Sequence, residues 1–264
     1  MSSALAQRIP VDPRIDRRRT EVARARSRRR RRLLFVLGGV VGLGVTAVSV
    51  AYYTPLFAAR HVRVEGAVHT SASQVVRVAG LAGHPPLLAV NGGGDAARLE
   101  ALPWVATASV ERRWPDSVVV RVVERAPVAA MARPAGSQAA WALVDGTGRV
   151  LDWTETAPPG LVQLYAPASV GRPGSQLAAP ARPGLAVASA LGALRSSVHE
   201  VRVSSDGEVT LVLSGGVVAV LGSDDELGPK LAALRSVLAG APPTGPETVD
   251  VTVPGEATVG PAQP

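Results

Sequence analysis

One uncharged stretch near the N-terminus constrains this chain more than any other feature. Residues 33–53 read LLFVLGGVVGLGVTAVSVAYY, which is twenty-one residues without a charge. A helix rises about 1.5 Å per residue, so this stretch is roughly 30 Å long, the thickness of the hydrocarbon core of a bilayer. Aromatic side chains lie near both ends, as they do at membrane interfaces: Phe35, Tyr52, Tyr53 and Phe57. The sequence therefore predicts a transmembrane helix over residues 33–53.

The positive charge of the chain is concentrated before this stretch. The formal net charge is +7, yet residues 1–32 hold twelve arginines and three acidic residues, which leaves −2 for all the rest. A nucleic-acid-binding domain spreads its basic residues over a folded face, so we expect no nucleic acid among the partners. We interpret residues 1–32 as a disordered cytoplasmic tail. An alternative is that this tail binds anionic lipid headgroups.

The arginines also set the expected orientation of the helix. Basic flanks stay in the cytoplasm, so residues 60–264 are expected on the outer side of the cell membrane, as in a single-pass type II protein. Two alternatives are a cleavable signal peptide and a twin-arginine export signal. Phe57-Ala58-Ala59 is a poor cleavage site and the apolar segment is long, so we favour an uncleaved anchor.

Residues 60–127 have the pattern of a small α+β domain. Alternating apolar residues indicate strands, and caps and glycine or proline breaks indicate helices. Five elements are predicted in this order: a strand at 61–65, a helix at 71–79 with a capping box at Ser71, a second helix capped by Asp95, and strands at 106–110 and 118–123. Two helices can cover one face of such a β-α-α-β-β sheet.

Five short motifs follow one another between residues 102 and 129. They are Leu102-Pro103-Trp104-Val105, Ala108-x-Val110, Arg113-Trp114-Pro115, Val120-x-Val122 and Glu124-Arg125-x-Pro127-Val128-Ala129. This ordered set resembles the signature of the FtsQ/DivIB cell-division proteins, and the element order resembles a POTRA domain. We interpret the motif residues as mainly structural. Trp104 is expected to pack at a helix-to-strand corner, and Trp114-Pro115 to form a hairpin turn. Glu124 and Arg125 are expected to end a strand.

Residues 128–255 predict a β-rich domain with flanking helices, an order similar to the domain that follows the POTRA domain in FtsQ-like proteins. The predicted elements are a hairpin around Asp145-Gly146-Thr147-Gly148, a strand at 161–165, a helix at 185–197, a meander between 198 and 221, a helix from Gly228–Pro229 to Gly240, and a last strand from Thr248 to Val253. Residues 256–264 are expected to be a disordered tail. The predicted fold class is therefore α+β, with a single transmembrane helix before the two domains.

The sequence offers no catalytic constellation. It has no cysteine, and its four histidines are not spaced as metal ligands. Gly92, Gly94 and Ala97 match the G-x-G-x-x-A pattern of dinucleotide sites, but no doubly wound βαβ series follows them. We therefore expect a flexible loop there, and we expect no cofactor, no metal and no enzymatic activity.

The family resemblance implies a scaffold of the division machinery, the divisome, which concentrates at the septum. It implies small bitopic partners resembling FtsB and FtsL outside the membrane, and other division proteins at the POTRA domain. The mechanism that we expect is strand addition to an exposed sheet edge. The candidate residues belong to the last predicted strand and the turn after it: Thr248, Val249, Asp250, Val251, Thr252, Val253 and Gly255.

Three alternatives stay open at this point. The last strand either binds a partner or only closes the sheet, and Thr252 stands where the resemblance predicts an arginine. A POTRA-bearing translocation or assembly factor is a second interpretation of the whole chain, although the sequence has one such repeat and no run of amphipathic membrane strands. An exported enzyme held by a membrane anchor is the third.

Overall fold

A computed structural model of the protein describes residues 32–46, 48–50, 52, 57–133, 140–240 and 245–261. The predicted tail, residues 1–32, lies outside the described residues except for its last arginine. The N-terminal helix runs from Arg32 to Val50, and its most apolar stretch of 18 residues has a mean hydropathy of 2.3. Within the described ranges it is the one helix long and apolar enough to cross a membrane.

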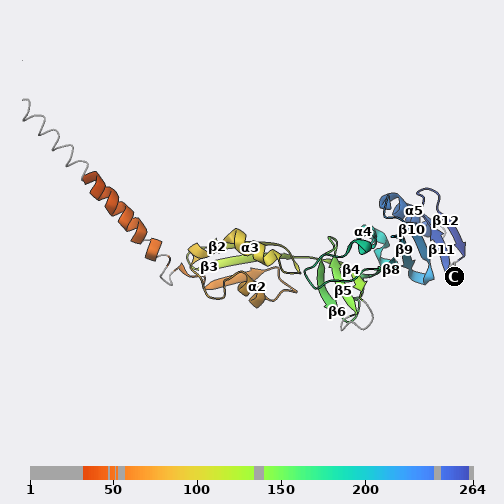
Figure 1. The fold of residues 1–264 in the computed structure, drawn as a ribbon, viewed down its shortest axis with the longest axis horizontal. Helices are drawn as coiled ribbons and strands as arrows, with labels where there is room; N and C mark the ends of the chain where they lie inside the picture. The colour runs from red at the N-terminus through yellow and green to blue at the C-terminus, as the bar shows by residue number, and fades with distance from the viewer. Residues whose placement is uncertain are drawn as a thin grey trace, which may run out of the picture.

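A three-stranded domain follows this helix in the chain and precedes the larger sheet (Figure 1). Its elements are β1 (His61–Glu65), α2 (Ala72–Val78), α3 (Gly92–Glu100), β2 (Val105–Arg113) and β3 (Ser117–Glu124). The strand order is β1-β3-β2, with β1 parallel and β2 antiparallel to the central β3. The β-α-α-β-β order predicted from the sequence is confirmed.

The two faces of this sheet are chemically different because apolar and polar residues alternate along its strands. Val118, Val120 and Val122 of β3 are buried beneath α2 and α3, against Val75 and Leu99. The opposite face carries a chain of ion pairs across all three strands, and it consists of Glu65, Arg121, Glu111 and Arg113. Ser71 caps α2 as predicted, since its hydroxyl accepts the main-chain N–H of Gln74.

The start of α3 differs from the prediction. Asn91, not Asp95, is the N-cap residue, and its side-chain oxygen accepts the N–H of Gly94 at 3.2 Å. Asp95 lies one turn further on, buried, and pairs with Arg98 at 2.7 Å. The glycine-rich segment is therefore the first turn of a helix and not a loop. Gly92 is needed there because a Cβ atom would lie only 2.8 Å from the carbonyl oxygen of Val110 in β2.

The second domain contains a mixed sheet of nine strands with the order β12-β11-β10-β9-β8-β7-β4-β5-β6. The strands are β4 (Pro127–Ala132), β5 (Trp141–Asp145), β6 (Val150–Thr154), β7 (Val162–Tyr165), β8 (Val198–Val203), β9 (Val209–Leu213), β10 (Val218–Gly222), β11 (Glu247–Asp250) and β12 (Thr258–Pro261). The hairpin, the short strand near residue 162 and the β8-β9-β10 meander were all predicted, and they are confirmed.

Two helices cover one face of the large sheet. They are α4 (Arg182–Ala190) and α5 (Leu227–Gly240), which contribute Val187, Ala188 and Leu234 to the core. Helix α4 approaches the sheet closely at Gly184, where a Cβ atom would lie 2.5 Å from side-chain atoms of Leu164 and Val203. The single helix predicted over 185–197 is wrong: α4 ends at Ala190, and a separate 3-10 helix, Gly192–Ser196, begins at Gly192, which has a positive φ.

The end of the chain also differs from the prediction. The strand expected over residues 248–253 ends at Asp250, because the Asp250 carboxylate accepts the N–H of Thr252 at 2.9 Å and the chain turns there. Gly255, with a φ of +92°, lies in the same connection. Residues 258–261, expected in a disordered tail, form β12 against β11. The strand predicted to be the last one, β11, therefore lies inside the sheet, and β12 forms the edge.

Candidate interaction sites

The aromatic and charged motif residues of the three-stranded domain lie at two opposite ends of its sheet. Arg113-Trp114-Pro115 forms the turn between β2 and β3, at the end where β1 begins. Trp104, Glu124 and Arg125 lie at the other end, next to the nine-stranded domain. The motifs therefore mark one end that follows the N-terminal helix in the chain and one end that forms the interdomain junction.

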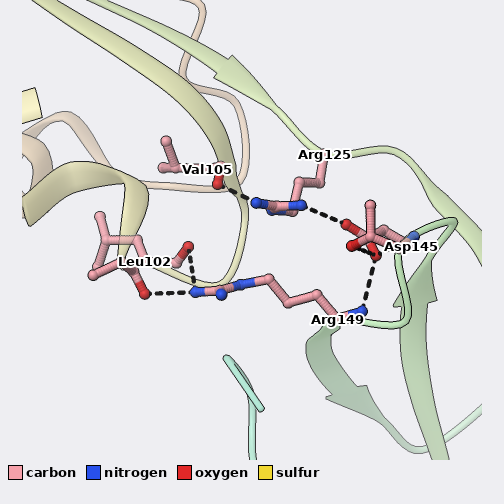
Figure 2. Close-up of polar contacts among 7 residues, drawn as sticks. Leu102, Val105, Arg125, Asp145 and Arg149 are labelled. Carbon is pink, nitrogen blue, oxygen red and sulfur yellow. Dashed lines mark hydrogen bonds and ion pairs between the residues drawn. The ribbon is translucent and has the colours of Figure 1, made fainter. Parts of the chain in front are cut away.

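An ion pair between Arg125 and Asp145 joins the two domains (Figure 2). The Arg125 guanidinium donates to the Asp145 carboxylate at 2.8 Å and, through Nε, to the carbonyl of Val105 at 3.0 Å. Asp145 ends β5 and its side chain is 6% exposed, whereas that of Arg125 is 19% exposed. Removing one partner of such a pair is expected to cost more than breaking a surface ion pair, because it leaves a largely buried charge unpaired.

The hairpin that carries Asp145 also reaches back to the first domain. The guanidinium of Arg149 donates to the carbonyl of Ala101 at 2.7 Å and contacts that of Leu102, just after α3 (Figure 2). Burial raises the pKa of Asp145, but hydrogen bonds from Thr147, Arg125 and the Arg149 main chain outweigh it and lower that pKa. Asp145 is therefore held as a carboxylate at neutral pH, which keeps the pair with Arg125 charged.

Trp104 fills the same junction with an apolar contact. Its indole packs against a small cluster on the second domain, made of Ala130, Leu143 and Leu151. The opposite partner of the indole is the His69 ring, which stacks on it at 3.9 Å with an angle of 2°. The residue lies between a helix and a strand as predicted, but it packs across two domains rather than within one.

Glu124 fixes the loop that carries His69. Its carboxylate accepts the main-chain N–H groups of Val68, His69 and Thr70 at 2.9–3.0 Å, and it contacts His69 Nδ1 at 2.8 Å. Burial opposes ionisation, but these hydrogen bonds outweigh it and lower the pKa of Glu124 to about 2. Glu124 thus holds His69 in place beneath the Trp104 ring.

Strand β12 forms one edge of the large sheet, at the end far from the first domain (Figure 1). It pairs with β11 through Thr248–Gly260, Val249–Val259 and Asp250–Thr258. After β11, the N–H of Val251 donates to the carbonyl of Val220 in β10. Alternation along a parallel strand then directs Val249 to β10, and Thr248 and Asp250 to β12.

This register leaves one residue of β12 with both of its backbone groups directed away from the sheet. Thr258 and Gly260 bond to β11, so the N–H and C=O of Val259 point outward. The backbone of Pro261 also faces outward, but Pro261 has no N–H to donate. Proline is tolerated at the edge of a sheet for this reason. The side chain of Val259 is 52% exposed, although it lies beside the fully buried Val249. An added strand would satisfy this backbone and cover this side chain.

The opposite edge of the sheet is already partly occupied. At β6, the N–H of Val150 donates to the carbonyl of Ser175 at 2.9 Å, and the N–H of Gly174 donates to the Val150 carbonyl at 2.7 Å. A segment of the same chain therefore uses the edge of β6 that an added strand would need. β12 is the more open of the two edges.

The residues predicted to bind a partner do not lie at this open edge. Thr248, Val249 and Asp250 belong to β11, which has a neighbour on both sides. The others lie in the connection between β11 and β12: Val251, Thr252, Val253 and Gly255. Sequence reasoning missed β12 and its Val259, because a short segment with glycine and proline has little strand propensity.

The described part of the chain holds no group of three or more side chains that could bind a metal ion.

Arg149 is a junction residue that sequence reasoning did not single out. Its partners are main-chain carbonyls, so no pairing of residue types in the sequence pointed to it.

Comparison with known proteins adds to this description. The family model of the FtsQ-type POTRA domain matches residues 57–125, and that of the FtsQ/DivIB C-terminal domain matches residues 135–251. Cell division protein FtsQ of Mycolicibacterium smegmatis is 33% identical over 82% of this chain and 61% of its own length, and that of Mycobacterium leprae is 31% identical over 86% and 61%.

The chain thus spans about three-fifths of the length of these two relatives. Cell division protein FtsQ of Streptomyces bingchenggensis is 30% identical over 85% of this chain and 84% of its own length. Two matched domains in the correct order and a relative covered over most of its length agree with the fold. The chain belongs to the FtsQ/DivIB family of cell-division proteins.

Proposed function

We propose that this chain is a membrane-anchored scaffold of the divisome, which binds small bitopic partners resembling FtsB and FtsL during septum formation. The apolar helix Arg32–Val50 is its single span, with the arginine-rich N-terminus in the cytoplasm and both domains on the outer side. Relatives named as cell division protein FtsQ support this role. We expect the chain to concentrate at the division septum.

The observation that carries the proposal is the open edge at β12. A partner segment in extended conformation would exchange hydrogen bonds with Val259 and use the carbonyl of Pro261. It would also cover the exposed side chain of Val259. Backbone pairing gives such an interface affinity with little dependence on side-chain identity. The far position of β12 from the first domain leaves that domain available for other division proteins (Figure 1).

A proline at residue 259 tests this edge directly. Val259→Pro removes the outward N–H but leaves the pairs of Thr258 and Gly260 with β11 intact. We expect affinity for co-expressed FtsB-like and FtsL-like proteins of the same cell to fall about tenfold or more, the effect of losing about 1.4 kcal/mol. Val259→Thr keeps the backbone groups and should bind nearly as well as the original chain.

Val253→Pro is the matched control. Val253 is an equally exposed valine, 53% against 52%, and it lies outside the strands, in the connection before β12. Binding should survive this change. If Val259→Pro is folded and retains full partner binding, strand addition at β12 is wrong. If Val253→Pro alone abolishes binding, the connection and not β12 is the contact.

A further inference from the structure

An aromatic pair, with Trp114 exposed and Phe57 half-buried, lies at the end of the three-stranded domain that follows the apolar helix. Phe57 and Trp114 meet edge to face, with ring centroids 5.6 Å apart and an angle of 69° between the planes. Trp114 is 54% exposed, and neither ring belongs to the core of this domain. A large indole left in water at the tip of a turn has no part in packing the core, which calls for another explanation.

The chain itself keeps this pair near the membrane. Phe57 follows Val50, where the candidate membrane span ends, by seven residues. Even a fully extended chain of that length spans at most about 25 Å. The turn that carries Trp114 is fixed to the same point, because the N–H groups of Arg60 and His61 donate to the carbonyl of Asp116 at 2.9 and 3.2 Å.

The charged residues around the pair are suited to phosphate headgroups. Arg60, Arg112 and Arg113 are all exposed here. The two acidic neighbours are already engaged: Glu111 contacts Arg113 at 3.0 Å, and Asp116 contacts His61 at 3.2 Å. A hollow beside Trp114 is lined by Arg112 and Arg113, together with Glu111, whose carboxylate is paired with arginine. Arginine binds phosphate strongly, and tryptophan favours the interfacial layer of a bilayer.

We propose that Phe57 and Trp114, with Arg60 and Arg112, form a membrane contact that enters the outer leaflet at headgroup depth. The aromatic rings lie among the glycerol and upper acyl groups, and the arginines bind anionic phosphates. This contact would fix the tilt of the three-stranded domain on the membrane and thereby direct β12 away from the surface. The inference rests on the proposed membrane anchoring of the chain.

Tryptophan quenching in nanodiscs tests the contact on the full chain. The discs would contain equal parts of phosphatidylcholine and phosphatidylglycerol, with lipids brominated high on the acyl chain as quenchers. We expect quenching in the original chain and loss of most of it in Trp114→Phe. Trp153→Phe is the matched control, because Trp153 is also an exposed tryptophan, 39%, but lies on β6 of the other domain. That variant should keep the quenching.

The arginines are tested in the same assay. Arg60→Gln combined with Arg112→Gln should lower the quenching severalfold, whereas Arg202→Gln, an exposed arginine on β8, should not. Equal quenching of Trp114→Phe and the original chain would overturn the membrane contact. Absence of quenching in a chain that has entered the discs would overturn it as well, while leaving the anchor intact. A chain that does not enter the discs would refute the anchor, and the contact with it.

Discussion

Arg125 and Asp145, twenty residues apart in the chain, meet at 2.8 Å across the boundary between the two domains. Two further contacts cross the same boundary: Arg149 of the second domain bonds to the first domain, and Trp104 of the first domain packs on the second. This arrangement makes the junction a fixed connection. In the proposed scaffold role, a fixed connection would determine where β12 is presented relative to the membrane.

Removal of the arginine should weaken the fold measurably. Arg125→Ala leaves Asp145 largely buried without its charged partner, so we expect the free energy of unfolding to fall by about 2 kcal/mol. Urea unfolding of the two domains measures this. Arg113→Ala, which breaks an ion pair in which the arginine is 62% exposed, is the control and should cost no more than about 0.5 kcal/mol. Equal effects of the two changes would mean that the junction is no stronger than a surface contact.

Trp104 should contribute more to stability than the ion pair does. Trp104→Ala opens a gap between the His69 ring and the cluster of Ala130, Leu143 and Leu151, with an expected loss of about 3 kcal/mol. Trp104→Phe should lose much less, because a ring remains. Limited proteolysis gives a second measurement: the Ala variant should be cut between β3 and β4 earlier than the original chain. Unchanged cutting would contradict a role for Trp104 at the junction.

The stability of the junction should depend on pH through Glu124. Its pKa in the folded chain is about 2, below the usual 4.5, so its contribution to stability is complete above pH 4.5 and is lost as the pH falls toward 2. Glu124→Gln should therefore be clearly less stable than the original chain at pH 7, and the difference should shrink as the pH is lowered through this window. Urea midpoints at several pH values measure the difference, and one that stays constant down to pH 2 would contradict this assignment.

Close packing of α4 on the sheet should exclude any side chain at residue 184. Gly184→Ala places a Cβ atom 2.5 Å from side-chain atoms of Leu164 and Val203, so the helix must shift. We expect a loss of about 2 kcal/mol, in the range of other overpacked cores. Gly228→Ala in α5 is the control, because nothing lies within 4 Å of the new atom. This change should leave the stability of the fold unchanged or raise it. The thermal midpoints of both variants give the comparison.

The sequence predicted the local elements well, since each depends on a pattern within a few residues. The alternation of Val118, Val120 and Val122 fixed β3, and Ser71 fixed the start of α2. The prediction failed where a weak segment depends on a distant partner. Thr258–Pro261 forms a strand only because β11 is there to pair with it, and Asn91 was overlooked as a cap because glycines follow it.

The junction could be predicted in part. The resemblance pointed to Trp104, Glu124 and Arg125, but their partners come from other elements and cannot be identified from spacing. Asp145 has the sequence of an ordinary hairpin turn, and its carboxylate does serve that turn through Thr147 and Arg149. The same carboxylate also binds Arg125. Only the structure shows that Asp145 both stabilises its own turn and binds Arg125.

The amide of Val259 provides the most direct test of the account. In the chain alone its N–H points away from the sheet and should exchange with solvent quickly, whereas those of Thr258 and Gly260, bonded to β11, should exchange slowly. On addition of the FtsB-like partner, we predict that exchange at Val259 slows to the rate of its two neighbours. A complex in which Val259 still exchanges as in the free chain would contradict strand addition at β12.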